Sequence, residues 1–528
     1  MADAAPPEAP TPADFTFAPL SPVSFLSRAA AVFGERTAIV DGELTFTYAE
    51  FHQRSGQLTA ALADLGVQPG DRVAALCANS HVMLELHHGV LGFGAVLVPL
   101  NIRLSEAELG YILEHSGATL LVATAEFAEA ARTIADAAGI RVIVAGGADD
   151  EYEALLTTAT APVWRDADER GLLAINYTSG TTGRPKGVMY HHRGAHLQSL
   201  AMAYHTGIGP GSAYLWTLPM FHCDGWCFPW ALTAAGATHV CLRAIDTAQI
   251  WRHLTEDGIT HFSAAPTVLT MIAEDPAAAP LDHTVHATTG GAPPSPSLLA
   301  RMADLGVEVT HLYGLTETFG PIAVNQWQPE WDAGGADARA QLKARQGIGN
   351  ISAGMLRVVT PDGDDVPADG ATEGELVARG NNVMLGYYRD PDASAVATVN
   401  GWLRTGDVAV MHPDGYAEIR DRSKDVIISG GENIASVEVE RVLDSHSDVV
   451  ESAVVARADD RWGEVPVAYV TIRHGADLSA DVLIEFAREH LARFKVPKQI
   501  VFAELPKTST GKIQKNVLRR QVQQDGES

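Results

Sequence analysis

Residues 177–187 concentrate side chains that could bind a phosphate group. They read Tyr-Thr-Ser-Gly-Thr-Thr-Gly-Arg-Pro-Lys-Gly, so four hydroxyls and Lys186 stand among three glycines. Glycines let the backbone approach a ligand closely, while hydroxyls and loop amides donate hydrogen bonds to phosphate oxygens. The segment is not a Walker A loop, because Pro185 and Gly187 stand where that motif requires Gly and Ser or Thr. We expect a phosphate-binding loop that follows an apolar strand and precedes a helix.

Two further segments carry carboxylates in glycine-containing loops. In Tyr313-Gly-Leu-Thr-Glu-Thr318 an aromatic face, a hydroxyl and a carboxylate stand together. In Thr405-Gly-Asp407 a carboxylate follows a glycine, where it could accept hydrogen bonds from both hydroxyls of a ribose. An isolated Asp407 would more often be a solvated turn residue. Its place in this series of motifs favours ribose binding.

The C-terminal part of the chain contributes cationic side chains. Arg422 and Lys424 lie in Asp421-Arg-Ser-Lys-Asp425, shortly before the glycines of Ile427-Ile-Ser-Gly-Gly-Glu-Asn433. Lys512 ends the loop Pro506-Lys-Thr-Ser-Thr-Gly-Lys512, where a lysine beside a glycine can be placed at a site and withdrawn. Lys507 lies on the other side of that glycine and is the weaker candidate for a lysine that acts at the site.

The aromatic segment Phe221-His-Cys-Asp-Gly-Trp-Cys-Phe-Pro-Trp230 is the most informative for substrate. An isolated histidine such as His222 would more often be structural. Trp226 lies near enough to it to be a candidate for a pocket wall, whereas Phe228 and Trp230 fit an ordinary core. The cysteines of this segment are spaced C-x-x-x-C, but no second pair at metal-binding spacing accompanies them. Buried apolar cysteines are therefore the favoured interpretation.

Together and in this order, the motifs resemble those of the adenylate-forming superfamily, which contains acyl-CoA synthetases, firefly luciferases and peptide-synthetase adenylation domains. The resemblance runs from about Phe25 to Leu518. It implies that the protein uses ATP and Mg²⁺, with coenzyme A as a co-substrate. It also implies two half-reactions: formation of an acyl-adenylate with release of pyrophosphate, then transfer of the acyl group to a thiol.

The resemblance also implies a role for each matching residue. Lys512, Thr316 and Glu317 would be catalytic, with Glu317 holding Mg²⁺. The implied nucleotide-binding residues are Thr178, Ser179, Gly180, Thr181, Thr182, Gly183, Lys186, Gly291, Ala292, Pro293, Tyr313, Gly314, Asp407 and Arg422. His222, Trp226 and Gly290 would line the acyl pocket. Lys424 would be the hinge of a domain rotation, and Gly430 and Gly431 would line the path of the pantetheine arm.

A narrower resemblance concerns the substrate acid. The segment Trp327–Trp331 and the run Lys343–Gly347 look like those of short- and medium-chain acyl-CoA ligases and methylmercaptopropionate-CoA ligases. This implies a short, medium-chain or small aryl acid and a role in fatty acid metabolism. Three alternatives stay open: a ligase that loads an acyl-carrier protein, an amino-acid adenylation domain that uses Asp224, and a nucleotide-binding protein without ligase activity.

These motifs are expected on a large α/β domain. Strand and helix patterns alternate from Thr37 to Val122 and resume at Leu172, which predicts parallel sheets covered by helices. Short strands separated by Gly and Asp turns follow Arg345 and predict a small β-barrel element. We expect a flexible arm at 1–15, an N-terminal AMP-binding domain at 16–421, and a small mobile α+β domain at 422–528 with its hinge near 424.

The overall charge restricts the partners. With 38 basic and 65 acidic residues the formal net charge is −27, which argues against nucleic acids and anionic membranes as partners. The sequence contains no apolar run long enough for a membrane span and no secretory signal pattern, so a cytoplasmic location is expected. Four cysteines in 528 residues suit a reducing compartment. A homodimer is compatible with these features.

Overall fold

A computed structural model describes residues 18–159, 161–178, 184–430, 432–459, 461–473, 475–508 and 512–526. The predicted arm at 1–15 lies outside these residues. So do Ser179, Gly180, Thr181, Thr182 and Gly183 of the phosphate loop, and Gly431.

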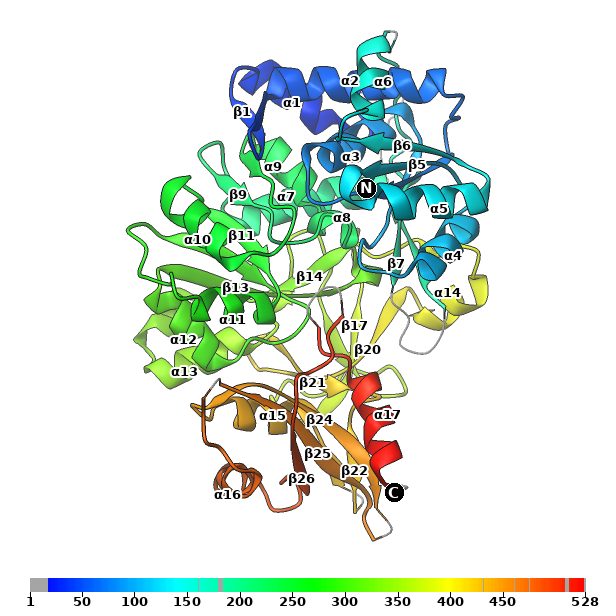
Figure 1. Ribbon diagram of the computed structural model, residues 1–528. Helices are drawn as coiled ribbons and strands as arrows, with labels where there is room; N and C mark the ends of the chain where they lie inside the picture. Colours follow the sequence, from blue (N-terminus) through cyan, green and yellow to red (C-terminus); the bar gives the residue numbers. More distant parts are fainter. Residues whose placement is uncertain are drawn as a thin grey trace, which may run out of the picture.

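The strands of the large domain divide between two mixed sheets (Figure 1). The nine-stranded sheet has the order β15-β14-β13-β12-β11-β9-β10-β1-β2, and the seven-stranded sheet β18-β8-β7-β4-β3-β5-β6. The first sheet consists of β1 (Thr37–Asp41), β2 (Leu44–Thr47), β9 (Ala213–Leu215), β10 (Thr238–Val240), β11 (His261–Ala264), β12 (Val285–Thr289), β13 (Val307–Leu315), β14 (Gly320–Val324) and β15 (Ile348–Gly349). The second consists of β3 (Arg72–Leu76), β4 (Val96–Pro99), β5 (Ala118–Thr124), β6 (Arg141–Ala145), β7 (Leu172–Thr178), β8 (Lys186–His191) and β18 (Gly386–Tyr387).

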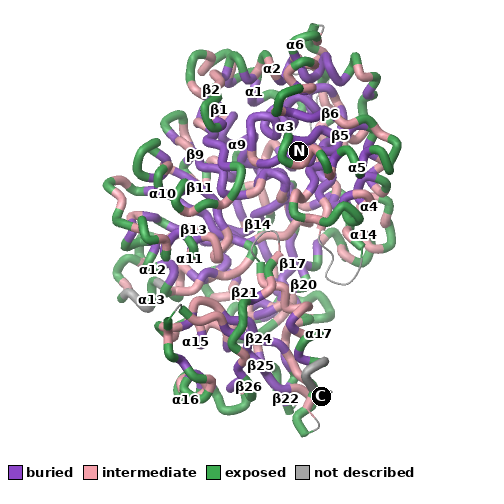
Figure 2. Tube along the Cα trace, viewed as in Figure 1, coloured by how far each residue is buried: buried purple, intermediate pink, exposed green. Residues whose placement is uncertain are grey.

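Helices cover both sheets, as the alternating pattern predicts. Helix α3 (His81–Phe93) is buried along its whole length, and its neighbours α2 (Tyr48–Asp64) and α9 (Phe228–Ala235) share its core. Figure 2 shows this core as the continuous buried region of the upper body. The other helices of this part are α1 (Val23–Phe33), α4 (Glu106–Ser116), α5 (Ala128–Ala138), α6 (Glu151–Thr158), α7 (His192–Thr206), α8 (Cys223–Trp226), α10 (Thr247–Glu256), α11 (Pro266–Glu274), α12 (Pro296–Asp304), α13 (Ala336–Ala344) and α14 (Pro391–Ala397).

One local prediction is wrong. The phosphate loop is followed by strand β8, not by a helix, and β8 pairs antiparallel with β7 from Thr178↔Lys186 to Leu172↔His191. Val188 and Tyr190 are buried in this strand, because β-branched and aromatic side chains pack well on a pleated sheet. The helix begins only at His192. Thr178 and Lys186, on either side of the loop, are therefore paired strand residues.

The predicted small β element is a five-stranded sheet. Its order is β16-β17-β20-β19, and β21 also pairs with β20. The strands are β16 (Arg357–Val359), β17 (Glu373–Ala378), β19 (Thr398–Val399), β20 (Trp402–Met411) and β21 (Ala417–Arg422). Strand β21 ends where the sequence places the domain boundary.

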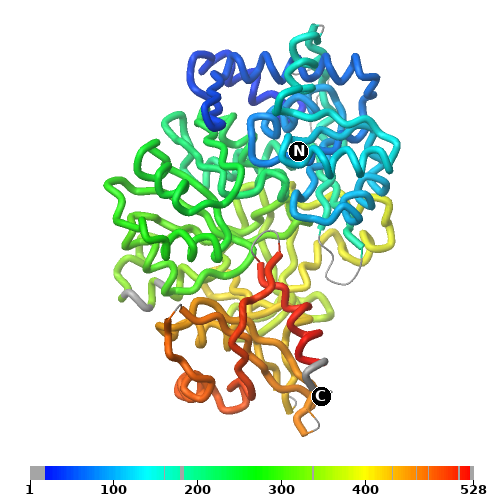
Figure 3. The backbone as a smooth tube through the Cα atoms, in the orientation of Figure 1, coloured from blue at the N-terminus to red at the C-terminus, as the bar shows by residue number. Residues whose placement is uncertain are grey.

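The C-terminal part has its own core around Ile427, Val439 and Val454. It contains β22 (Ile427–Ser429), β23 (Glu432–Ile434), α15 (Ser436–Asp444), β24 (Val449–Asp459), β25 (Gly463–Ile472), α16 (Ala480–His490), β26 (Gln499–Phe502) and α17 (Lys515–Gly526). In Figure 3 the red segment before α17 rises from this part toward the large domain. Among the described helices, none is both long and apolar enough to cross a bilayer.

Candidate active site

The carboxyl ends of β12 and β13 bring two motifs together. These strands are parallel neighbours, so Gly290, which follows β12, and Tyr313, near the end of β13, lie at the same edge. Gly291, with φ +86°, makes a turn that other residues rarely adopt. Gly314 is required for another reason: a Cβ there would come within 2.0 Å of the carbonyl oxygen of Gly320. Ala292 and Pro293 continue the loop after β12.

Asp407 lies at the centre of the sugar-binding candidates. It stands directly opposite Arg422 in the register of β20 and β21, and the Arg422 Nε lies 2.9 Å from Asp407 Oδ1. The Tyr313 hydroxyl donates to Asp407 Oδ2 at 2.6 Å. Burial, followed by the charge of Asp407, raises the pKa of Tyr313. The structure thus joins Tyr313 to a pair of residues that lie 94 and 109 positions further along the chain.

Two tyrosines connect the phosphate-loop hairpin to the Thr316–Glu317 turn. The Tyr190 hydroxyl, from β8, donates to the Thr316 carbonyl at 2.6 Å. The Tyr387 hydroxyl, from β18, donates to Glu317 Oε1 at 2.8 Å. The Lys186 ammonium lies 4.7 Å from the centre of the Tyr387 ring. Thr178, at the end of β7, pairs with Lys186 across the hairpin.

Lys512 reaches this region from the C-terminal part. The residue is exposed by surface area, yet partial desolvation by the surrounding protein lowers the pKa of its ammonium to about 8. The positive charges of Arg422, Lys424 and Lys515 lower the pKa further, while Asp407 opposes them. The charges of Asp407 and Arg422 therefore both act on the Lys512 ammonium.

The charge of the same lysine also acts on His222. Burial, followed by the charge of Lys512, lowers the pKa of His222 to about 4, so the imidazole is neutral near pH 7. Trp226 is 6% exposed, and its indole lies against two glycines. A Cβ on Gly290 would come within 3.0 Å of the indole, and one on Gly320 within 3.1 Å. As predicted, Phe228 and Trp230 are completely buried core residues.

The hinge candidate Lys424 follows β21, and the tunnel candidate Gly430 follows β22. Lys424 occupies the turn after β21, which is closed by a hydrogen bond from the Asp425 amide to the Arg422 carbonyl at 2.8 Å. Burial and the charge of Arg422 lower the pKa of Lys424. Gly430 has φ +62°, and its amide donates to the Trp462 carbonyl at 2.7 Å. Lys507, the weaker lysine candidate, pairs with Glu451 of its own part at 2.8 Å.

Contacts between the two parts hold this arrangement. The Ser436 amide, at the start of α15, donates to Asp421 Oδ2 at 2.5 Å. Arg441 Nη1 lies 3.0 Å from Glu418 Oε1 of β21. A second ion pair joins Arg473 to Glu274.

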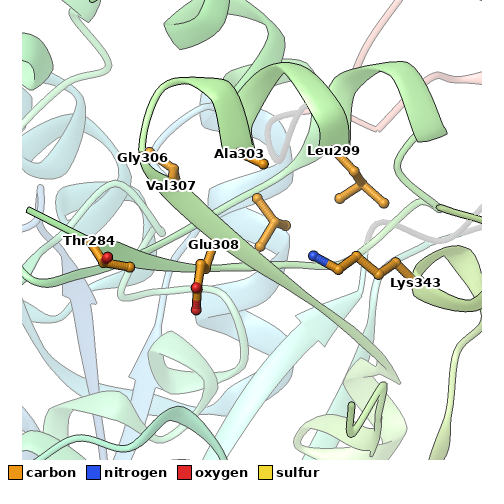
Figure 4. A pocket seen from close by; sticks show the side chains of 8 residues that line it. Thr284, Leu299, Ala303, Gly306, Val307, Glu308 and Lys343 are labelled. Atoms are coloured by element: carbon orange, nitrogen blue, oxygen red, sulfur yellow. The ribbon is translucent and has the colours of Figure 1, made fainter. Parts of the chain in front are cut away.

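In the described part of the chain, no group of three or more His, Cys, Asp or Glu side chains could hold a metal ion. The four cysteines are buried and unbonded, as the sequence predicts. A cavity of about 240 Å³ lies elsewhere, on α12 and β13, with Glu308 and Lys343 at its sides (Figure 4). It shares no residue with the site described above.

Comparisons with known proteins agree with this geometry. The model of the AMP-binding enzyme family matches residues 26–388, and that of the AMP-binding enzyme C-terminal domain matches 438–512. The chain belongs to the AMP-binding enzyme family. It is 44% identical to an acetate/butyrate–CoA ligase of Arabidopsis thaliana that is described as peroxisomal, over 98% of this chain and 96% of the relative.

Solved AMP-binding enzymes share the whole fold. ATP-bound MatB of Rhodopseudomonas palustris superposes with a TM-score of 0.84 at 27% identity, covering 94% of this chain and 98% of MatB. The o-succinylbenzoate–CoA synthetase of Bacillus subtilis, in complex with its acyl-adenylate intermediate, gives 0.81 at 28% identity, covering 94% and 97%.

Two features of this AMP-binding enzyme were not found from its sequence. Tyr387 contacts Glu317 across 70 positions, and nothing local to Gly386-Tyr387 indicates that partner. Asp224, considered above as a ligand for a substrate amine, is instead completely buried beside His87 of α3. Residues 223–227, which form its turn, all have positive φ. The sequence signals this conformation only weakly, because Gly225 is the single glycine of the segment.

Proposed function

We propose that this AMP-binding enzyme is an ATP-dependent carboxylate–CoA ligase for short acids. The observation that carries the proposal is the position of Lys512. A lysine of the C-terminal part lies where its charge acts on both His222 and the Asp407–Arg422 pair. One cation thus acts on both the candidate acyl site and the candidate ribose site, and we infer that a carboxylate and an α-phosphate meet beside it.

In the first half-reaction the substrate carboxylate attacks the α-phosphorus of ATP. A bond forms between a carboxylate oxygen and the α-phosphorus. The bond between the α-phosphorus and the oxygen that bridges it to the β-phosphorus breaks, and pyrophosphate leaves. Negative charge accumulates at the reacting centre, so positioning and charge stabilisation should supply most of the catalysis. Lys512 would bridge the two reacting groups, Asp407 would hold the ribose, and the hairpin ending at Lys186 would hold the outer phosphates.

The residues around Glu317 fit a magnesium ion. Its Oε1 already accepts the Tyr387 hydroxyl, which orients the carboxylate. Mg²⁺ usually takes only one or two carboxylates, with waters and substrate phosphates as its other ligands, so a single Glu is sufficient. Bound there, Mg²⁺ would offset the phosphate charge.

The second half-reaction requires the same site to admit a thiol. We infer that the C-terminal part turns about Lys424, which withdraws Lys512 and brings the Gly430 face toward the acyl-adenylate. The thiolate then attacks the acyl carbonyl, the thioester forms and AMP leaves. Lys424→Pro should stall this step while adenylation continues, because proline fixes φ at the hinge. An unchanged overall rate would argue against the hinge.

A short acid is favoured by Trp226. Its indole fills the space between Gly290 and Gly320, at the edge where the acyl group would extend. The acetate/butyrate–CoA ligase from Arabidopsis supports the same size range. We therefore infer a short acid of the size of acetate or butyrate.

The test is pyrophosphate release with ATP and Mg²⁺ over acetate, butyrate, hexanoate, dodecanoate, benzoate, methylmercaptopropionate and amino acids, each with and without coenzyme A. Acid-dependent release, with acyl-CoA formed only when coenzyme A is present, is the expected result. Release from amino acids alone would favour the amino-acid alternative. Release without acyl-CoA would favour a carrier-protein acceptor, for which no relative named above gives support.

A further inference from the structure

The segment that carries His222 and Trp226 has an unusual backbone. Residues 223–227 all have left-handed φ values, between +47° and +65°, and only Gly225 among them lacks a Cβ. L-residues adopt this conformation singly and at a cost, so a run of five requires strong support from its surroundings. Such strain is typical of functional sites.

Two side chains of the left-handed turn contact different parts of the protein. Trp226 lies against Gly290 and Gly320 of the acyl site, and Asp224 lies inside the core against α3. Gly225 must be a glycine, because a Cβ there would come within 2.7 Å of the Trp216 ring. Only two peptide units therefore separate Asp224 from Trp226.

Asp224 faces a buried histidine of α3. Its Oδ1 lies 3.5 Å from His87 Nε2, and both side chains are 0% exposed. His87 Nδ1 lies 2.7 Å from the Met83 carbonyl. That oxygen can only accept, so Nδ1 carries a proton and Nε2 points at the carboxylate. Burial raises the pKa of Asp224, and His87 followed by Asn176 opposes this shift.

Several buried polar atoms of Asp224, His87 and Asn176 lack a hydrogen-bond partner in the part of the chain that the structure describes. Within the described residues, both oxygens of Asp224, the Nε2 of His87 and both amide atoms of Asn176 are buried without a hydrogen bond. Buried polar groups are normally paired, and an unpaired buried carboxylate is especially unfavourable. The carboxylate and the imidazole therefore depend on each other, through one shared proton or an ordered water.

We propose that the Asp224–His87 pair is a positioning device that fixes the left-handed turn and so sets the Trp226 wall that selects the length of the acid. The pair touches no substrate; it acts through the turn. This inference rests on the proposed function. It assigns to a buried Asp–His pair a selectivity that Trp226 alone would otherwise explain.

The test uses Asp224→Asn, which keeps the shape and removes the charge, and His87→Gln. The matched control is His88→Gln, since His88 is the adjacent buried histidine of α3 but lies against Thr233, 3.4 Å away, and Phe51. For each variant, kcat and KM are measured for butyrate and hexanoate, together with the KM for ATP and the unfolding midpoint.

We expect Asp224→Asn and His87→Gln to raise the KM for butyrate and to reduce the preference for butyrate over hexanoate by at least about tenfold, the discrimination that one or two methylenes provide. The KM for ATP should change less than about twofold, because nucleotide binding uses other elements. His88→Gln should leave the preference intact.

An unchanged preference in Asp224→Asn, with only a lower unfolding midpoint, would overturn the proposal. So would aggregation of both pair variants while His88→Gln stays soluble, because the pair would then serve folding alone. A wild-type enzyme that makes no acyl-CoA from any acid would instead refute the proposed function, so the two failures are distinguishable.

Discussion

The lowered pKa of Lys512 predicts how the first half-reaction depends on pH. The lysine must be charged to approach the carboxylate and the α-phosphate together. Burial, followed by the positive charge of Arg422, lowers its pKa to about 8 from the usual value of 10.5. The charged form is therefore lost as pH rises through about 8, well below the pH at which a solvated lysine would lose its proton.

The size of the effect follows from this pKa. About 90% of Lys512 would be charged at pH 7, about half at pH 8 and about 9% at pH 9. The kcat/KM for ATP, which reports on the free enzyme, should fall close to tenfold per pH unit above about 8.5. His222, with a pKa of about 4, contributes nothing in this range.

ATP–pyrophosphate exchange without coenzyme A isolates the first half-reaction, so the titration of the coenzyme thiol near ~8.5 does not interfere. Lys424→Gln removes one of the cations that lower the pKa of Lys512, so the falling limb should move to higher pH. Lys507→Gln is the control, because Lys507 pairs with Glu451 and should leave the limb in place.

A kcat/KM that stays flat or rises between pH 7.5 and 9.5 would refute the reasoning, since no charge lost from Lys512 could then limit adenylation. A limb that is present but does not respond to Lys424→Gln would show that a different group titrates.

Three other outcomes are expected. Lys512→Ala should reduce ATP–pyrophosphate exchange by about 10²–10³-fold, the usual effect of removing one charge-stabilising group. Thioester formation from supplied acyl-adenylate should be spared. An equal loss of both activities, or a similar loss of exchange in Lys507→Gln, would contradict the role of Lys512. Trp226→Gly should improve the kcat/KM ratio of hexanoate to butyrate at least about tenfold, because it opens the space above Gly290, and an unchanged ratio would place the wall elsewhere. Tyr387→Phe should raise the Mg²⁺ concentration for half-maximal exchange by about 2- to 10-fold, since one hydrogen bond to a carboxylate contributes ~0.5–1.5 kcal/mol; an unaltered Mg²⁺ dependence would separate Tyr387 from the metal site.

Much of this protein could be predicted without its structure. The hairpin of β1 and β2, the buried helix α3 and strands such as β11 and β26 follow from short-range patterns of apolar residues, turns and glycines. The motifs around Lys186, Glu317, Asp407 and Lys512 could be found in order, because each is contiguous in the chain. For these features the information lies within about ten residues, which is the range over which periodicity and turn chemistry act.

The tertiary structure decided what those patterns could not. The alternating rhythm from Thr37 to Val122 gave no sign that β1 joins the nine-stranded sheet while β3 joins the other. It also favoured a helix after the phosphate loop, where pairing with β7 instead selects a strand. Partner choice among strands depends on packing between segments far apart in the chain, and local propensity does not encode it.

The same distinction separates the candidate residues from their surroundings. The sequence by itself determined which side chains could perform adenylation, because their types and spacing are local. Only the structure decided that Tyr387 orients Glu317, that the charge of Lys512 acts on His222, and that Asp224 is buried against His87. These contacts set the pKa values and the shape of the acyl wall, since burial and charge are properties of the folded chain.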